Sequence, residues 1–104
     1  VQRTDSETRG EDTALSRAAQ QGHVDIVEML LTHRADLETK DRDKRTPLSS
    51  AAYAGHGDIV EMLLTHLADI ETSDADQNTP LISAAHTGHG GIVEMLLTHR
   101  ADIE

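Results

Sequence analysis

The chain has 104 residues, of which 19 are acidic and 9 are basic, so its formal net charge is −10 with neutral histidine, and this length predicts a single domain. The negative charge disfavours nucleic acids and anionic membrane surfaces, which attract basic proteins, and it favours basic or neutral protein partners. The sequence has no cysteine and no apolar run near the roughly 20 residues that cross a bilayer, which excludes disulfide bonds and membrane helices and favours an intracellular protein of the cytoplasm or nucleus.

Residues 1–12 are polar and highly charged, and they begin with Val1 rather than methionine. We expect them to form an N-terminal hairpin or cap segment, and we expect the chain to be a piece of a longer protein. Arg17 stands where later blocks of the sequence have serine, so it adds to a partial polar cap.

Three blocks that each open on threonine follow, at Thr13, Thr46 and Thr79, so the period is 33 residues. Each block contains a nearly identical stretch, which reads GHVDIVEMLLTHRAD in the first. A fixed period of this length is typical of stacked repeats, in which each unit buries its apolar face against a neighbour. We therefore expect a first unit at 13–45, a second unit at 46–78 and a truncated, uncapped third unit at 79–104.

Each unit is expected to contain two short helices and a polar loop. In the second unit, Thr46 is a suitable N-cap and Pro47 a suitable first residue for a helix over residues 47–54. A second helix over residues 58–66 has an apolar stripe at helical spacing. This stripe consists of Ile59, Val60, Leu63 and Leu64. The polar residues 68–78 are expected to form a hairpin that leads to the next unit.

The motifs TPL (TAL in the first unit), AA, GH, IV, LL and AD, in this order, resemble the ankyrin repeat, and the resemblance covers Thr13 to Glu104. It implies an all-α solenoid of stacked helix–turn–helix units with short β-hairpin loops, in which the hairpin tips and the first helices line a concave side. Family members usually bind other proteins there. The resemblance thus implies a protein–protein interaction module or scaffold that binds a protein or peptide. The alternative is an engineered or consensus-derived array, serving as a folding model or binding scaffold without a natural partner, because the second helices are nearly identical.

The chain departs from the family pattern where the family usually has glycine. The glycine expected before each AD pair is replaced by Arg34, Leu67 and Arg100. The loop glycine is also replaced, by Glu11, Lys44 and Gln77. Where such a position keeps a left-handed backbone, a residue other than glycine costs on the order of 1 kcal/mol.

Positions that differ between units are not dictated by stacking, so they are candidates for contact with a partner. They fall in the hairpin tips and at the ends of the first helices, and we expect them on the concave side. Tyr53, the only aromatic residue, is the expected anchor, since aromatic residues dominate interface hot spots, and His86 is expected to share its patch. The candidates are Gln20, Gln21, Lys40, Arg42, Asp43, Arg45, Tyr53, Ala54, Ala75, Asp76, Asn78, His86 and Thr87.

Metal binding and catalysis are not expected. Six of the seven histidines form two ladders along helices that stack roughly 8–10 Å apart, whereas two ligand nitrogens on one zinc must lie within about 3.5 Å. The serines at 16, 49 and 83 lack a glycine-rich elbow or an oxyanion loop, and no phosphate-binding glycine motif is present. We therefore expect no catalytic residue, no metal, no cofactor and no enzyme activity.

The end of the third unit keeps the apolar pattern of the interior units, since IVEMLLTH recurs there without polar replacements. We therefore expect an uncapped C-terminal face and weak self-association through it.

Overall fold

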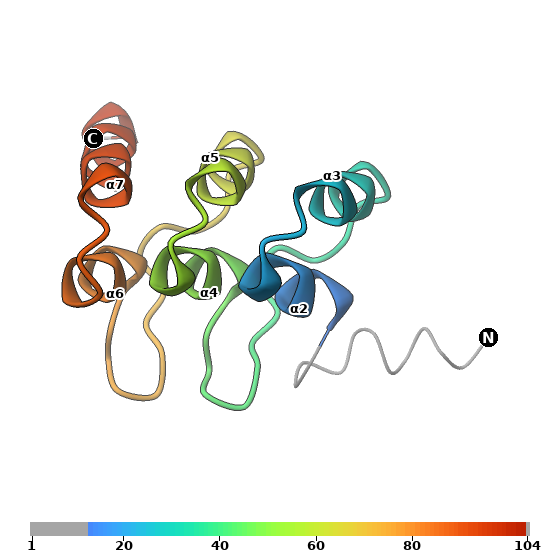
Figure 1. The fold of residues 1–104 in the computed structure, drawn as a ribbon, viewed down its shortest axis with the longest axis horizontal. Coiled ribbons are helices and arrows are strands. Elements are labelled where there is room, and N and C mark those ends of the chain that lie inside the picture. Colours follow the sequence, from blue (N-terminus) through green and yellow to red (C-terminus); the bar gives the residue numbers. More distant parts are fainter. Residues whose placement is uncertain (1–12, 104) are drawn as a thin grey trace.

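The computed structural model of the chain describes residues 13–103, and within this range it contains six helices and no strand (Figure 1). The expected N-terminal hairpin or cap at residues 1–12 lies outside the described residues. The helices are α2 (Ala14–Gln21), α3 (Val24–Thr32), α4 (Pro47–Ala54), α5 (Gly57–Thr65), α6 (Pro80–His86) and α7 (Gly90–Ile103). The all-α class expected from the sequence is confirmed.

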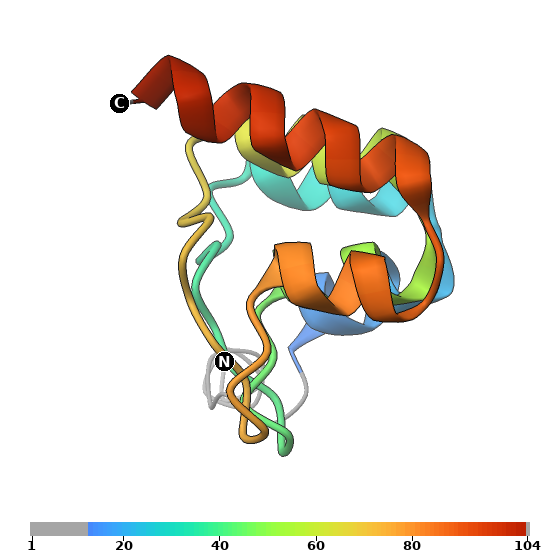
Figure 2. The same ribbon diagram turned by 90° about the vertical axis from the view of Figure 1, so that its left-hand side faces the viewer.

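The helices form two rows. In Figure 1, α2, α4 and α6 lie side by side in one row, and α3, α5 and α7 lie in the other. Figure 2 shows that the two helices of a unit run antiparallel and that the loops between units extend beyond the first helices. The expected solenoid of helix–turn–helix units is therefore present, with each unit resting on the next.

Each first helix begins at a threonine cap. The side chains of Thr13, Thr46 and Thr79 accept a hydrogen bond from the backbone N–H three residues later. Proline follows the cap in α4 and α6, where its fixed φ suits the first helical position. The predicted helix over residues 47–54 coincides with α4, while α5 begins and ends one residue before the predicted limits.

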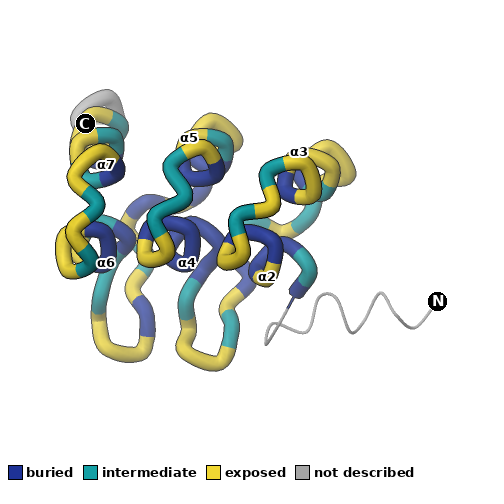
Figure 3. The backbone as a smooth tube through the Cα atoms, viewed as in Figure 1, coloured by how far each residue is buried: buried dark blue, intermediate teal, exposed yellow. Residues whose placement is uncertain are grey.

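The core consists of aliphatic residues between the two rows (Figure 3). The first helices carry small buried alanines on their facing sides, so α4 packs closely and extensively against α2 and α6. The second helices carry larger aliphatic residues and touch one another much less. Because one row is packed more tightly than the other, the stack curves toward the first helices and the loops, which makes that side concave (Figure 1).

The same leucine of each unit contributes to one apolar seam. Leu63 and Leu96 are buried, and Leu30, at the N-terminal end of the stack, is half-buried against the same cluster. The expected inward stripe of the second unit is buried throughout. The regular spacing of the apolar residues therefore predicts the interfaces between units correctly.

Among the polar contacts between the first unit and the second, two run between a side chain and the backbone. The His56 ring nitrogen Nε2 lies 3.1 Å from the carbonyl oxygen of Gln20. The carboxylate of Glu38 accepts a hydrogen bond of 2.7 Å from the N–H of Asp69. In both contacts a side chain of one unit binds a backbone group of the other. They therefore help to fix the position of the second unit relative to the first.

Within residues 13–103, four residues other than glycine adopt a left-handed backbone: Arg34, Lys44, Leu67 and Gln77. All four stand at positions where the family resemblance implies glycine. The expectation of a left-handed residue does not extend to Arg100, because α7 continues through it to Ile103. A helical backbone avoids the steric cost that an arginine meets in the left-handed region, and Arg100 pairs instead with Glu71 at 3.1 Å.

We predict that Leu67→Gly raises the free energy of unfolding by up to about 1 kcal/mol. Leu67 is exposed and has a φ of 70°, so glycine relieves roughly 1–2 kcal/mol of strain, partly offset by greater freedom in the unfolded chain. Urea denaturation of both proteins measures the difference. Leu67→Ala is the control, because it removes the exposed apolar side chain but retains Cβ; an equal gain in that variant would contradict the backbone explanation.

Candidate functional site

A depression of about 280 Å³ lies where the first two units meet. We call it the Tyr53 pocket. It is lined by Gln20, Gln21, Arg45, Ser50, Tyr53 and Ala54. The two glutamines end α2, three residues come from α4, and Arg45 ends the loop between the units. The pocket therefore lies on the side of the first helices and the loops, and two units are needed to build it.

Arg45 is held on two sides. Its guanidinium carbon lies 4.4 Å from the centroid of the Tyr53 ring, a cation–π contact. Its Nε lies 3.5 Å from Oδ2 of Asp74, a buried carboxylate in the following loop. Tyr53 remains 41 % exposed beneath it. Arg45 thus links the aromatic ring of α4 to the next loop and orients the wall of the pocket.

The loop that carries Arg45 is organised by Asp41. The carboxylate oxygen Oδ1 of Asp41 accepts hydrogen bonds from the N–H groups of Asp43 (2.8 Å) and Arg45 (2.9 Å). The N–H of Asp41 donates to the carbonyl of Arg45 at 3.1 Å, which closes the turn. The expected hairpin is therefore a tight turn stabilised by a side chain, and it has no strand.

The following loop repeats this arrangement around Asp74. Its Oδ1 accepts from the N–H groups of Asp76 (2.8 Å) and Asn78 (2.9 Å). The N–H of Ala75 donates to the carbonyl of Asp43 at 2.9 Å, so the two loops are joined directly. Together with the Arg45 contact, this bond makes the pair of loops one continuous edge of the site.

The pKa of the Asp74 carboxyl lies below its ordinary value. Burial acts to raise this pKa, but the N–H groups of Asn78 and Asp76 and the charge of Arg45 stabilise the carboxylate and outweigh burial. A carboxyl whose pKa falls on folding stabilises the fold above the unfolded value of about 3.9, and this contribution disappears as the pH drops through the folded value.

We predict that Asp74→Asn lowers the free energy of unfolding by about 1–2 kcal/mol at neutral pH, because it removes a buried charge with charged and backbone partners. The difference from the unmodified chain should shrink as the pH is lowered through the depressed pKa of folded Asp74, because the carboxyl is then protonated in both states. Urea denaturation across this pH range measures it. Asp43→Asn is the control, since Asp43 is exposed and its contact with Ala75 runs through its backbone carbonyl; a loss that stays constant with pH would contradict the prediction.

The structure brings five of the sequence-derived candidates together in the Tyr53 pocket, namely Gln20, Gln21, Arg45, Tyr53 and Ala54. The other candidates lie outside it. Those in the two loops are Lys40, Arg42, Asp43, Ala75, Asp76 and Asn78, and those at the end of α6 are His86 and Thr87. His86 does not line the pocket with Tyr53. Thr87 donates its hydroxyl to the carbonyl of Ser83 at 2.9 Å and so caps α6.

Two residues of the site were missed by sequence reasoning. Ser50 and Asp74 recur at the same place in a neighbouring unit, as Ser83 and Asp41, so they resemble framework positions. The signal that could have identified Asp74 is the change from Arg45 to the uncharged Asn78 between units. A charge present in one unit alone suggests a local partner.

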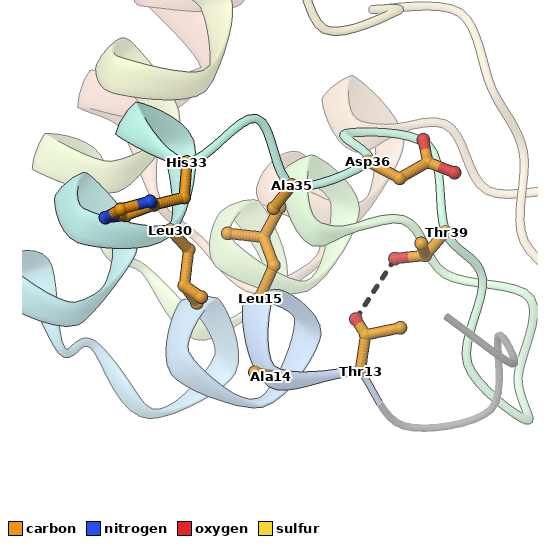
Figure 4. A pocket seen from close by; sticks show the side chains of 8 residues that line it. All are labelled: Thr13, Ala14, Leu15, Leu30, His33, Ala35, Asp36 and Thr39. Carbon is orange, nitrogen blue, oxygen red and sulfur yellow. Dashed lines mark hydrogen bonds between the residues drawn. The ribbon is translucent and has the colours of Figure 1, made fainter. Parts of the chain in front are cut away.

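A larger depression of about 380 Å³ lies at the N-terminal end of the stack (Figure 4). Its wall is mostly apolar, with Leu15 and Leu30 in its centre and a hydrogen bond of 3.2 Å between the Thr13 and Thr39 hydroxyls beside it. The leucines that correspond to Leu30 in the next units, Leu63 and Leu96, are buried inside the stack. This depression is thus a stacking face without a neighbour among the described residues.

Among the described residues, no group of three or more His, Cys, Asp or Glu side chains is placed to hold a metal ion. None of the helices in this part of the chain combines the length and apolar character that a membrane span requires. Two histidines have structural partners: His56 contacts the first unit, and Nδ1 of His66 lies 2.9 Å from the carbonyl of Met62 in its own helix.

Stacked antiparallel helix pairs that repeat along the chain define a helical-repeat protein. The family model for ankyrin repeats, in three copies, matches residues 15–104. The match covers most of the chain, so the chain belongs to the ankyrin repeat family. Ankyrin repeats are generally modules for protein–protein interaction, and they are typically not enzymes.

Proposed function

We propose that this chain binds a protein or peptide on its concave side, with the Tyr53 pocket at the centre of the contact. The observation that carries the proposal is the convergence of Gln20, Gln21, Arg45, Tyr53 and Ala54 in one depression. These positions vary between units of otherwise fixed sequence, so stacking alone does not account for them. An exposed aromatic ring in a concave wall is the kind of residue that contributes strongly to interfaces.

The overall charge of −10 favours a partner that is basic or neutral as a whole, and disfavours nucleic acids and anionic membranes. The acidic side chains of the second helices contribute to this field from the outer surface, where Asp58 and Glu61 are exposed. We therefore propose a protein partner whose long-range attraction comes from the acidic body and whose specific contacts lie in the pocket.

A pull-down with the tagged chain, followed by measured affinity for the captured partner, tests this proposal. Tyr53→Ala is expected to weaken binding at least about tenfold, because truncation of an aromatic hot spot typically costs 2 kcal/mol or more. Glu61→Ala on the outer face of α5 is the control and should bind as the unmodified chain does. Partners that bind Tyr53→Ala equally well would show that the pocket is not the binding site.

An engineered or consensus-derived array is the second candidate, favoured by one observation. The stretch IVEMLLTH recurs unchanged in all three units. Sequencing the reading frame that surrounds this segment distinguishes the two. Identical frameworks throughout the frame favour an engineered array, whereas repeats that diverge favour a natural scaffold.

We also propose weak self-association through the end faces of the stack. At the C-terminal face Leu97 is 49 % exposed, whereas the equivalent Leu64, which precedes the third unit, is buried; Ile82 of the third unit is exposed as well. At the N-terminal face Ile26 and Met29 are exposed, while the equivalent Ile59 is buried. The two faces therefore carry the residues that pack against each other inside the chain.

We predict that Leu97→Glu abolishes this association, because a charge cannot be buried unpaired in an apolar interface. Sedimentation equilibrium over a range of protein concentrations measures the mass. Thr98→Glu introduces the same charge at an exposed neighbouring position of α7 and should leave the association intact. Equal masses for the unmodified chain and Leu97→Glu at every concentration would remove the basis for this proposal.

A further inference from the structure

The terminal groups of Arg45 are free to bind a ligand. The Tyr53 ring covers one face of its guanidinium and Asp74 faces its Nε. Among the described residues, no hydrogen bond occupies its two Nη groups. Because these contacts fix the side chain, little conformational freedom is left to lose when the Nη groups bind a ligand.

The chemistry of the pocket suits a carboxylate. Two adjacent Nη groups match the two oxygens of a carboxylate in a bidentate pair, the strongest hydrogen-bonded arrangement that arginine makes with a side chain. Gln20 and Gln21 line the same pocket and are exposed, and a side-chain amide can donate to a carboxylate. The exposed Tyr53 ring offers an apolar surface for the methylene groups that carry such a carboxylate.

The charge of the residues near the pocket also favours a carboxylate ligand, although the chain as a whole is acidic. Residues 40–45 contain four of the nine basic residues of the chain and two acidic ones. The equivalent residues 73–78 contain two acidic residues and no basic one. The carboxylates of Asp41 and Asp74 are both engaged by backbone N–H groups. The loop of residues 40–45 therefore carries a net positive charge, although the net charge of the chain is negative.

We infer that the Tyr53 pocket receives a glutamate or aspartate side chain of the partner peptide, bound end-on by the Nη groups of Arg45. The inference rests on the proposed function and specifies it further. It also assigns the position, because Asn78 and His86 stand 33 residues after Arg45 and Tyr53 and cannot form the same pair. The acidic residue of the partner binds between the first and second units and nowhere else on the concave side.

The experiment uses the intact chain and a random-peptide library displayed on phage. Selected peptides are resynthesised without tyrosine or tryptophan, so that Tyr53, the only aromatic residue of the chain, reports binding in the pocket by its own fluorescence. Each peptide is then compared with the variant in which its glutamate or aspartate is changed to glutamine or asparagine. This comparison requires no change in the chain.

We expect peptides that alter Tyr53 fluorescence to lose about tenfold or more in affinity when the carboxylate becomes an amide, as charged hydrogen bonds do when neutralised. In the Arg45→Gln chain the two peptides should differ by less than about threefold. Arg34→Gln removes one exposed positive charge elsewhere and should retain the full difference. Thermal unfolding verifies that both chains are folded.

Two other outcomes overturn the inference in distinguishable ways. Peptides that alter Tyr53 fluorescence but bind equally well as acid and amide would overturn the inference and leave the proposed function standing. Selection of peptides that leave Tyr53 fluorescence unchanged, or of none at all, would overturn the proposed function together with the inference.

Discussion

Ile59→Ala is expected to lower the free energy of unfolding by about 3 kcal/mol, within the range of 2–5 kcal/mol found when a large buried aliphatic residue is truncated. Ile59 is 0 % exposed because it lies in α5, against the first unit. Its loss leaves a cavity in the contact that couples the two units. In a stack whose units contact mainly their neighbours, such a cavity weakens one interface directly. Urea denaturation, with the midpoint and the slope both reported, measures the effect.

The chain contains its own control for this prediction. Ile26 lies in the same local sequence, DIVEMLLTH, but is 44 % exposed at the N-terminal end of the stack. Ile26→Ala should cost less than about 1 kcal/mol, since little apolar area is lost and alanine is the better helix former. A similar cost at both positions would mean that the stability of each helix is intrinsic and does not arise from stacking.

Gly22→Ala is expected to be nearly as destabilising, by about 2–3 kcal/mol. Gly22 ends α2 with a φ of 82°, where a residue with Cβ costs roughly 1–2 kcal/mol. An added Cβ would also lie 2.6 Å from Cε1 of His56. The ring would have to move and lose its contact with the carbonyl of Gln20, a further cost of about 1 kcal/mol.

Two other glycines separate these contributions. Gly88 has a φ of 78° but no atom near the position of an added Cβ, so Gly88→Ala should show the backbone cost alone. Gly91 lies in α7 with neither a positive φ nor an atom close to the position of an added Cβ. Gly91→Ala should therefore be neutral or slightly stabilising. Thermal or urea denaturation of the three variants measures how much each one lowers the free energy of unfolding. Equal costs for Gly22→Ala and Gly88→Ala would show that the His56 ring moves without loss.

Local signals predicted the helices of this chain well, because its caps and its periodicity agree. Thr46, Pro47 and Gly55 mark both ends of α4, and the apolar stripe of α5 is buried as expected. The end of α7 was harder, since the residues around Arg100 repeat those around Arg34 but remain helical. Identical local sequence permits both conformations there, so the difference comes from the surroundings of the segment.

The candidate site was only partly predictable. Comparing units identified the residues that vary, and five of these converge in the Tyr53 pocket. It did not identify the contact between Arg45 and Asp74, which joins two loops 29 residues apart in sequence, counting from 45 to 74. The comparison of units also placed His86 in one patch with Tyr53, although His86 does not line the pocket. The reason is that each first helix lies against the one before it, and α2 and α4 offer different residues to their neighbours.

The Tyr53 pocket draws its wall from α2, α4 and the loop that connects their units. A peptide seated there touches both sides of one junction, and its binding energy adds to the cohesion of that junction alone. The third unit gains nothing directly from the ligand. A bound peptide would therefore stabilise the first and second units against unfolding. The third unit would then be the first to unfold on heating or under mechanical load.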